Sequence, residues 1–171
     1  MQESNSAKEH KKQAPLAVNA AIVTVSDSRT IENDDSGKLI KNILIKNNHK
    51  VIGHTVIKDD KKEITRKIED LIKNGSLDLI ITNGGTGVAK KDLTIETIKP
   101  LFEKEISGFA ALFQKLSYDE IGSACMLSRA TAGIINNKVI FCLPGSPKAC
   151  ELALEKLIIP EIGHIVKHIH E

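Results

Sequence analysis

Apolar residues along the first half of the chain alternate between two periodicities. Residues 20–25 are rich in β-branched side chains and predict a first strand, whereas residues 36–47 place their apolar positions on one helical face. Residues 51–57 return to strand character, a second helix is expected between Asp60 and Gly75, and residues 77–82 form an unbroken apolar strand. Three strands alternating with two helices predict right-handed crossovers and a parallel sheet.

The second half of the chain is less regular. Thr94 is expected to cap a short helix, and residues 107–115 carry an apolar stripe that we assign to the core. Residues 129–135 and 138–143 flank Asn136-Asn137, and asparagine tolerates the positive φ angles of a tight hairpin turn. A β-hairpin here makes one strand of the sheet antiparallel.

The composition fits an α/β protein of one domain. The 171 residues are 41% hydrophobic, which is enough for a substantial core. Residues 1–17 are polar, charged and without periodicity, so they predict a disordered tail. We therefore expect a single folded domain over residues 18–171.

Charge and hydropathy restrict the partners. The net charge is +2 and only 3% of residues are aromatic, so the chain lacks both the basic surface and the stacking side chains of a nucleic-acid binder. No apolar stretch reaches the roughly 20 residues of a membrane span, and no apolar signal-peptide core is present. The sequence predicts a cytoplasmic protein that binds small molecules, not nucleic acid or membrane.

Cysteine and histidine spacings indicate no metal centre. Cys125, Cys142 and Cys150 have no C-x-x-C spacing and lie in apolar segments, which favours buried, inert thiols. His164 and His168 are four residues apart on an expected terminal helix, where cationic side chains are common without any ligand. We assign no chemistry to any of the five.

The strongest chemical signal is the glycine-rich stretch after the third strand, Gly84-Gly85-Thr86-Gly87, followed by Asp92. A backbone without Cβ atoms can approach a phosphate closely, and its successive N–H groups can bind an anion. A carboxylate beside such a loop suggests a bridging cation, so nucleotide chemistry with Mg²⁺ is the first hypothesis. A tight turn without any ligand would use the same glycines. Ser146-Pro147 can begin a helix after the hairpin, which makes a second candidate anion site.

Parallel topology brings three strand ends to one edge of the sheet. Ser26-Asp27 follows the first strand, Asp59 follows the second, and the glycine loop with Asp92 follows the third. Two carboxylates near a phosphate-binding loop can hold Mg²⁺, so Asp59 and Asp92 are the candidate catalytic pair. Each of them could instead cap a helix or close a solvated turn. Asp60 is the better cap, which leaves Asp59 available for chemistry.

Seven motifs occur in a fixed order between Ala20 and His164: Thr24-Val25-Ser26-Asp27, Ile57-Lys58-Asp59-Asp60, Gly84-Gly85-Thr86-Gly87 with Asp92-Leu93-Thr94, Gly108-Phe109, Leu116-Ser117-Tyr118, Ser128-Arg129-Ala130 and Pro144-Gly145-Ser146-Pro147. Together they resemble the MoaB/MogA family of molybdenum cofactor biosynthesis proteins, and the MoaB type most closely. The resemblance implies a three-layer α/β fold with helices on both faces of a mostly parallel sheet that has one antiparallel strand.

The resemblance also implies an activity, molybdopterin adenylylation. Such an enzyme uses Mg-ATP to attach AMP to the terminal phosphate of molybdopterin and releases pyrophosphate. Asp59 and Asp92 match the family's essential aspartates, which bind Mg²⁺ and orient ATP. Gly84, Gly85, Thr86 and Gly87 match the loop that approaches the ligand phosphates, and Ser26, Asp27, Ser146 and Pro147 match positions that line the pterin and nucleotide pocket. Arg129 has two interpretations, a phosphate contact or a structural ion pair.

Two other functions stay open at this point. One is a non-catalytic pterin-binding carrier or scaffold of the same fold, and the other is a nucleotide-processing hydrolase that shares the glycine-loop domain. The family resemblance further implies a homotrimer or homohexamer and suggests the metal-insertion protein of the same pathway as a partner. The cofactor that the pathway completes would contain molybdenum or tungsten.

Overall fold

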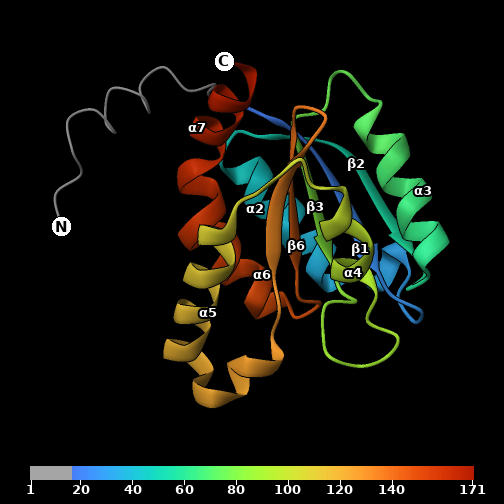
Figure 1. Cartoon of the computed structure of the whole chain (residues 1–171), viewed down its shortest axis with the longest axis vertical. Helices are drawn as coiled ribbons and strands as arrows, with labels where there is room; N and C mark the ends of the chain where they lie inside the picture. Colours follow the sequence, from blue (N-terminus) through green and yellow to red (C-terminus); the bar gives the residue numbers. More distant parts are fainter. Residues whose placement is uncertain (1–16) are drawn as a thin grey trace, which may run out of the picture.

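The computed structural model describes residues 17–171, which form a six-stranded sheet with the order β2-β1-β3-β6-β5-β4 (Figure 1). Strands β1, β2, β3 and β6 are parallel, whereas β5 is antiparallel to both of its neighbours, β4 and β6. The prediction of a mostly parallel sheet with one antiparallel strand is confirmed. The strands are β1 (Asn19–Val25), β2 (Lys50–Ile57), β3 (Leu79–Asn83), β4 (Lys104–Glu105), β5 (Thr131–Ile135) and β6 (Lys138–Leu143).

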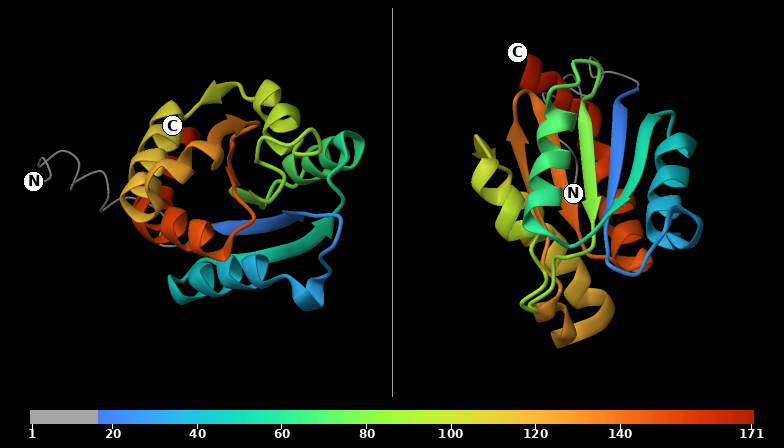
Figure 2. Two further views of the ribbon diagram at one scale, coloured as in Figure 1. Left: turned by 90° about the horizontal axis from the view of Figure 1, so that it is seen from below. Right: turned by 90° about the vertical axis from the view of Figure 1, so that its right-hand side faces the viewer.

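Helices cover both faces of the sheet, as Figure 2 shows from two directions. The apolar cores show that α2, α5, α6 and α7 pack on one face, and that α3 and α4 pack on the other. The helices are α2 (Asp35–Lys46), α3 (Lys61–Ile72), α4 (Thr94–Ile98), α5 (Ser107–Ile121), α6 (Pro147–Ala153) and α7 (Ile159–His170). Shorter turns are η1 (Ile31–Asn33), η2 (Lys99–Leu101), η3 (Gly122–Leu127) and the π-helical η4 (Leu154–Ile158). Over residues 17–171, no helix is long and apolar enough to cross a membrane.

The central position of β3 in the sheet explains why this part of the sequence is a continuous apolar run. Leu79 and Ile81 face the core under α2 and α7, Ile80 faces the core under α3, and all three are fully buried. A strand covered on both faces gains from apolar side chains at every position instead of every second one. The three-layer arrangement follows from this pattern.

The predicted helix cap at Asp60 and the predicted turn at Asn136-Asn137 are both confirmed. Asp60 caps α3 by accepting hydrogen bonds from the N–H groups of Lys62 and Glu63 at 2.9 and 3.0 Å. Asn136 and Asn137 have φ angles of 46° and 57°, as the tight hairpin turn between β5 and β6 requires. These elements are fixed by residues close together in the sequence.

Several boundaries differ from the sequence predictions. Strand β3 begins at Leu79, because Leu77 still donates to Asn74 O in a turn. Helix α5 extends to Ile121, beyond the predicted end at residue 115. Strand β4 was not predicted, since two residues carry no periodicity. The predicted disordered tail, residues 1–17, lies outside the described residues except for Ala17.

Candidate functional site

A pocket of 550 Å³ opens at the carboxyl ends of the parallel strands. Strand β1 lies between β2 and β3, and the helices that follow β1 and β2 cover opposite faces of the sheet. Chain connections therefore diverge next to β1, which is where ligands bind in open α/β sheets. The lining residues are Val25, Ser26, Asp27, Ser28, Asp59, Gly84, Gly85, Thr86, Gly87, Lys91, Asp92, Ala124, Leu127, Ser128, Pro144 and Gly145.

The glycine loop forms the floor of this pocket in a conformation that requires glycine. Gly84 and Gly85 have φ angles of 93° and 61°, and a Cβ at Gly84 would overlap the carbonyl oxygen of Val25. Thr94 fixes the loop from below: its hydroxyl donates to Gly84 O, and its N–H donates to Gly85 O, both at 2.9 Å. The predicted capping role of Thr94 is wrong, because Leu93 occupies the N-cap of α4 and the Thr94 hydroxyl serves the glycine loop instead.

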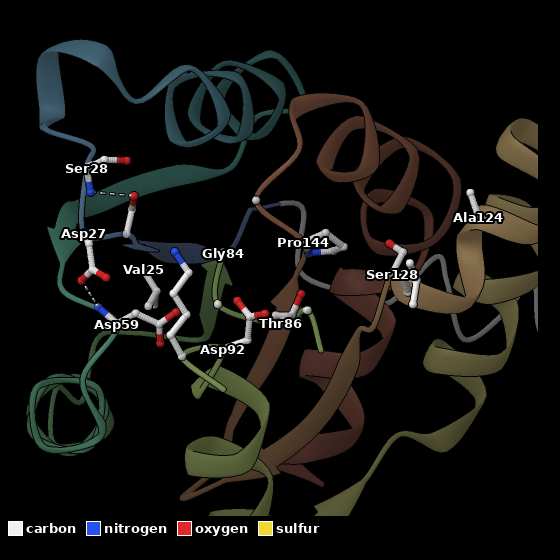
Figure 3. Close-up of a pocket in the computed structure, with 16 residues that line it drawn as sticks. Val25, Asp27, Ser28, Asp59, Gly84, Thr86, Asp92, Ala124, Ser128 and Pro144 are labelled. Carbon is white, nitrogen blue, oxygen red and sulfur yellow. Dashed lines mark hydrogen bonds between the residues drawn. The ribbon is translucent and has the colours of Figure 1, made fainter. Parts of the chain in front are cut away.

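Asp59 reaches the pocket from the end of β2. Its Oδ1 accepts from the N–H of Leu93 at 3.2 Å, and its own N–H donates to Asp27 Oδ1 at 3.3 Å (Figure 3). Its Oδ2 lies over Gly85, where a Cβ would come within 2.6 Å. One carboxylate oxygen thus supports the chain before α4, while the other lies against the glycine loop.

Asp92 occupies a comparable position on the other side of the loop. Its Oδ2 accepts from the N–H of Ala89 at 2.8 Å, and a Cβ on Gly87 would lie 2.7 Å from the same oxygen. Asp92 therefore has the turn-closing role that was the alternative interpretation, whereas Asp59 makes a long-range bond to Leu93 and closes no turn, and both aspartates line the pocket. Figure 3 shows Asp27, Asp59 and Asp92 around one cavity, with Ala124 and Ser128 on its far side.

The electrostatic environment of Asp59 favours a cation. Burial raises the pKa of its carboxyl group, and the hydrogen bond from Leu93 N–H opposes this effect. Repulsion from Asp92 and Asp27 raises the pKa further, and the positive charge of Lys91 lowers it, with a net upward shift. An anionic ligand entering among these carboxylates would be repelled unless a cation accompanied it.

The residues present fit a magnesium ion bound together with a phosphate ligand. Among residues 17–171, no group of three or more His, Cys, Asp or Glu side chains is placed to hold a metal. Mg²⁺ commonly takes only one or two carboxylates and completes its shell with water and substrate phosphates. Asp59 and Asp92 beside the glycine loop match that donor set.

Arg129 forms a structural ion pair. Its Nε donates to Thr86 O at 2.9 Å, and its Nη1 donates to Glu96 Oε1 at 2.7 Å. The hydrogen bond from Arg129 lowers the pKa of the Glu96 carboxyl group, despite some opposing desolvation. Of the two interpretations given to Arg129, the structure shows the ion pair with Glu96, and the hydrogen bond from Arg129 Nε to Thr86 O links the glycine loop to the segment before β5.

Ser146 and Pro147 were predicted to line the pocket and lie just outside it. Pro147 is the first residue of α6 as expected, but the Ser146 hydroxyl makes no capping hydrogen bond. Ser146 instead lines a second pocket of 520 Å³ between α5 and α6, and Ser128 lines both pockets. The turn after β6 therefore presents Pro144 and Gly145 to the first pocket and directs Ser146 to its neighbour.

Sequence reasoning missed several lining residues. Pro144, Gly145 and Ser128 lie in the ordered motifs quoted above, so a signal for them was present. Ala124 and Leu127 belong to η3, whose place opposite the glycine loop is set only by packing. Ser28 and Lys91 carry no distinctive local pattern.

A glycine loop and two aspartates at the carboxyl edge of an open α/β sheet place the pocket where such folds bind their ligands. The family model "Probable molybdopterin binding domain" matches residues 21–164. The chain belongs to this family, within its MoaB/MogA group of molybdenum cofactor biosynthesis proteins.

Named relatives and solved structures support this placement. Molybdenum cofactor biosynthesis protein B of Bacillus cereus is 48% identical over 163 residues, which is 95% of this chain and 96% of the relative. A crystal structure of a molybdenum cofactor biosynthesis protein B has a TM-score of 0.89 at 48% identity and covers 92% of this chain and 99% of that one. A second crystal structure, the "tungsten cofactor synthesizing protein MoaB from Pyrococcus furiosus", has a TM-score of 0.83 at 41% identity and covers 92% and 100%.

Proposed function

We propose that this protein acts in molybdenum or tungsten cofactor biosynthesis as a molybdopterin adenylyltransferase. The substrates would be molybdopterin and Mg-ATP, and the products adenylylated molybdopterin and pyrophosphate. The observation that carries the proposal is the placement of Asp59 and Asp92 against the two ends of the glycine loop in one pocket. The names of the relatives support the pathway.

The reaction joins two anions. An oxygen of the molybdopterin phosphate would attack the α-phosphorus of ATP, and the bond from that phosphorus to the oxygen bridging it to the β-phosphorus would break, with its electron pair leaving on pyrophosphate. Positioning and charge neutralisation matter more than a strong base, because the attacking phosphate oxygen is already ionised. A magnesium ion held by Asp59 and Asp92 would supply positive charge to the phosphates.

The chain's own residues would orient the substrates. Gly84 N–H is already bonded to Leu143 O at 3.0 Å, so phosphate contacts would come from the N–H groups beyond it, at Gly85 to Gly87. Lys91 would add a positive charge beside the carboxylates. Ser26 and Asp27 line this pocket, whereas Ser146 and Pro147 lie outside it, and a contact of any of the four with ATP or the pterin stays a prediction.

The test is Mg²⁺-dependent conversion of molybdopterin and ATP to adenylylated molybdopterin by wild type, Asp59→Asn and Asp92→Asn. The matched control is Asp60→Asn, which removes a neighbouring carboxylate while keeping a side chain that caps α3 well. We expect turnover by wild type and the control and a loss of at least about a hundredfold in both site variants. Thermal melts of all four proteins check that each is folded.

Three other results of this assay would each contradict a part of the proposal. Molybdopterin binding without product in wild type would replace the enzyme with a pterin-binding carrier or scaffold. Hydrolysis of ATP without a pterin would favour the nucleotide-processing hydrolase. Full activity in Asp59→Asn or Asp92→Asn would remove the carboxylate pair from the mechanism.

We further propose a homotrimer or homohexamer. Apolar side chains on α5 and η3 are exposed, and they offer a contact surface. They are Leu112, Tyr118, Ile121, Met126 and Leu127. Sedimentation equilibrium would give the number of subunits, and a monomer at micromolar concentration would contradict the proposal. The cytoplasmic location and the metal-insertion protein as a partner also stay predictions.

A further inference from the structure

One wall of the pocket, next to the glycine loop, is held in place by side chains that lie outside the pocket. This wall is the Pro144–Gly145 segment between β6 and α6. The hydroxyl of Ser36 donates to Gly145 O at 2.7 Å, and the thiol of Cys150 donates to Pro144 O at 3.2 Å. A Cβ on Gly145 would lie 3.3 Å from Gly84 Cα, so the two backbones are in close contact. The position of Gly145 therefore sets the distance between the wall and the glycine loop.

Ser36 lies in the first turn of α2 and does not line the pocket itself. Its position depends on Asp34, the N-cap residue of that helix. Asp34 Oδ1 accepts from Gly37 N–H at 3.0 Å, and Oδ2 accepts from Thr24 Oγ1 at 2.5 Å and lies 2.8 Å from His54 Nε2. The carboxylate joins β1, β2 and α2 at one point.

Asp34 and Ser36, which hold the Pro144–Gly145 wall, are both buried, and Asp34 is charged. Asp34 is 1% exposed and Ser36 is 4% exposed. Burial by itself raises the pKa of Asp34, but the hydrogen bonds from Thr24, Gly37 and His54 outweigh it, so that the pKa lies below its ordinary value. Asp34 is ionised at neutral pH and keeps these bonds, which fixes the turn that carries Ser36.

We propose that Ser36 is a positioning residue of the pocket. Its hydroxyl holds the Gly145 carbonyl group and thereby keeps the Pro144–Gly145 wall at the distance from the glycine loop that the ligand requires. The identity of the affected ligand, ATP, rests on the proposed function. The placement of the wall by Ser36 rests only on the geometry of the free protein.

The test compares wild type, Ser36→Ala and the control Thr97→Val. Thr97 is also buried, at 5% exposed, but it lies in α4 on the opposite face of the sheet. Each substitution removes one buried hydroxyl group. Hydrogen–deuterium exchange is first measured on the free proteins, and KM and kcat for ATP are then measured in the adenylylation assay.

We expect faster hydrogen–deuterium exchange within residues 143–149 of Ser36→Ala and unchanged exchange in strands β1 to β5. We also expect a rise of about 5- to 30-fold in KM for ATP with kcat within about twofold, since losing a uniform binding interaction raises KM alone. Thr97→Val should show neither change.

Unchanged exchange at residues 143–149 in Ser36→Ala would overturn the inference. Faster exchange over the whole chain in Ser36→Ala would also overturn it, and so would an equal increase at residues 143–149 in Thr97→Val. In either case the Ser36 hydroxyl would contribute only to general stability. An unchanged KM in an active enzyme would show that the wall does not position ATP. If wild type makes no adenylylated product while local exchange in Ser36→Ala rises, the proposed function fails and the positioning of the wall by Ser36 stands.

Discussion

Replacing Gly84 by alanine should destabilise the whole domain. The residue has a φ angle of 93°, and the new Cβ would overlap the carbonyl oxygen of Val25, at the end of β1. Backbone atoms of a buried strand cannot move aside as the end of a flexible side chain can. The substitution therefore combines an unfavourable backbone conformation with a steric clash.

The size of the effect follows from these two terms. A positive φ in a residue with a Cβ costs about 1–2 kcal/mol, and overpacking a tight site costs about 1–3 kcal/mol. Their sum is about 2–5 kcal/mol. A domain of this length loses about 2–4 °C in Tm for each kcal/mol, so Gly84→Ala should lower Tm by about 4–20 °C.

Thermal and urea unfolding of Gly84→Ala and Gly108→Ala, at one protein concentration, would measure this effect. Gly108 lies in the first turn of α5, where a Cβ would meet no atom within 4 Å. Alanine there should stabilise the protein slightly, by about 0.4–1 kcal/mol. A Gly84→Ala protein as stable as wild type would refute the argument that contact with Val25 requires glycine.

Three further predictions concern ionisable groups. Asp59→Asn should melt at a higher temperature than wild type at neutral pH without divalent cations, because the raised pKa of Asp59 means that its ionisation destabilises the fold. The difference in Tm should disappear below pH 3.8, the ordinary pKa of an aspartate, because Asp59 is then protonated in the folded and the unfolded state. A lower Tm for Asp59→Asn than for wild type at pH 7 would contradict this prediction. Asp34 has a lowered pKa, so its stabilisation should be complete above pH 3.8 and fall as the pH drops through the folded-state pKa. Acid titrations of the unfolding free energy should show this loss in wild type and not in Asp34→Asn. Burial raises the pKa values of Cys142 and Cys150 to about 12, so neither thiol should react with a disulfide reagent at pH 8 until the protein unfolds, and rapid labelling of the native protein would disprove this.

The unfavourable ionisation of Asp59 in the folded protein is consistent with its proposed role in holding a cation. A carboxylate that is partly buried beside two others is unfavourable for the apo fold. Such an arrangement is typical of functional sites, where a bound cation would offset the repulsion between the carboxylates. Mg²⁺ should therefore raise the Tm of wild type and leave that of Asp59→Asn nearly unchanged.

Sequence alone determined the features that depend on neighbours along the chain. The continuous apolar run of β3 indicated a strand covered on both faces, and Asn136-Asn137 indicated a tight turn. Asp60 was identified as a cap because capping bonds join residues two and three positions apart. The meeting of Asp59 with the glycine loop also followed from sequence, because parallel strands with crossover helices end at one edge.

Tertiary structure alone decided the contacts between residues far apart in sequence. The sequence predicted a cap at Thr94, and only the packing of α4 beneath the pocket directs its hydroxyl to Gly84 O. Arg129 meets Glu96, 33 residues away, and Ser36 meets Gly145, 109 residues away. No periodicity encodes such pairs, since their geometry depends on the final positions of whole helices and strands. The chain's pattern therefore specified where the pocket forms, and the packing of distant elements specified which side chains face it and which support it from behind.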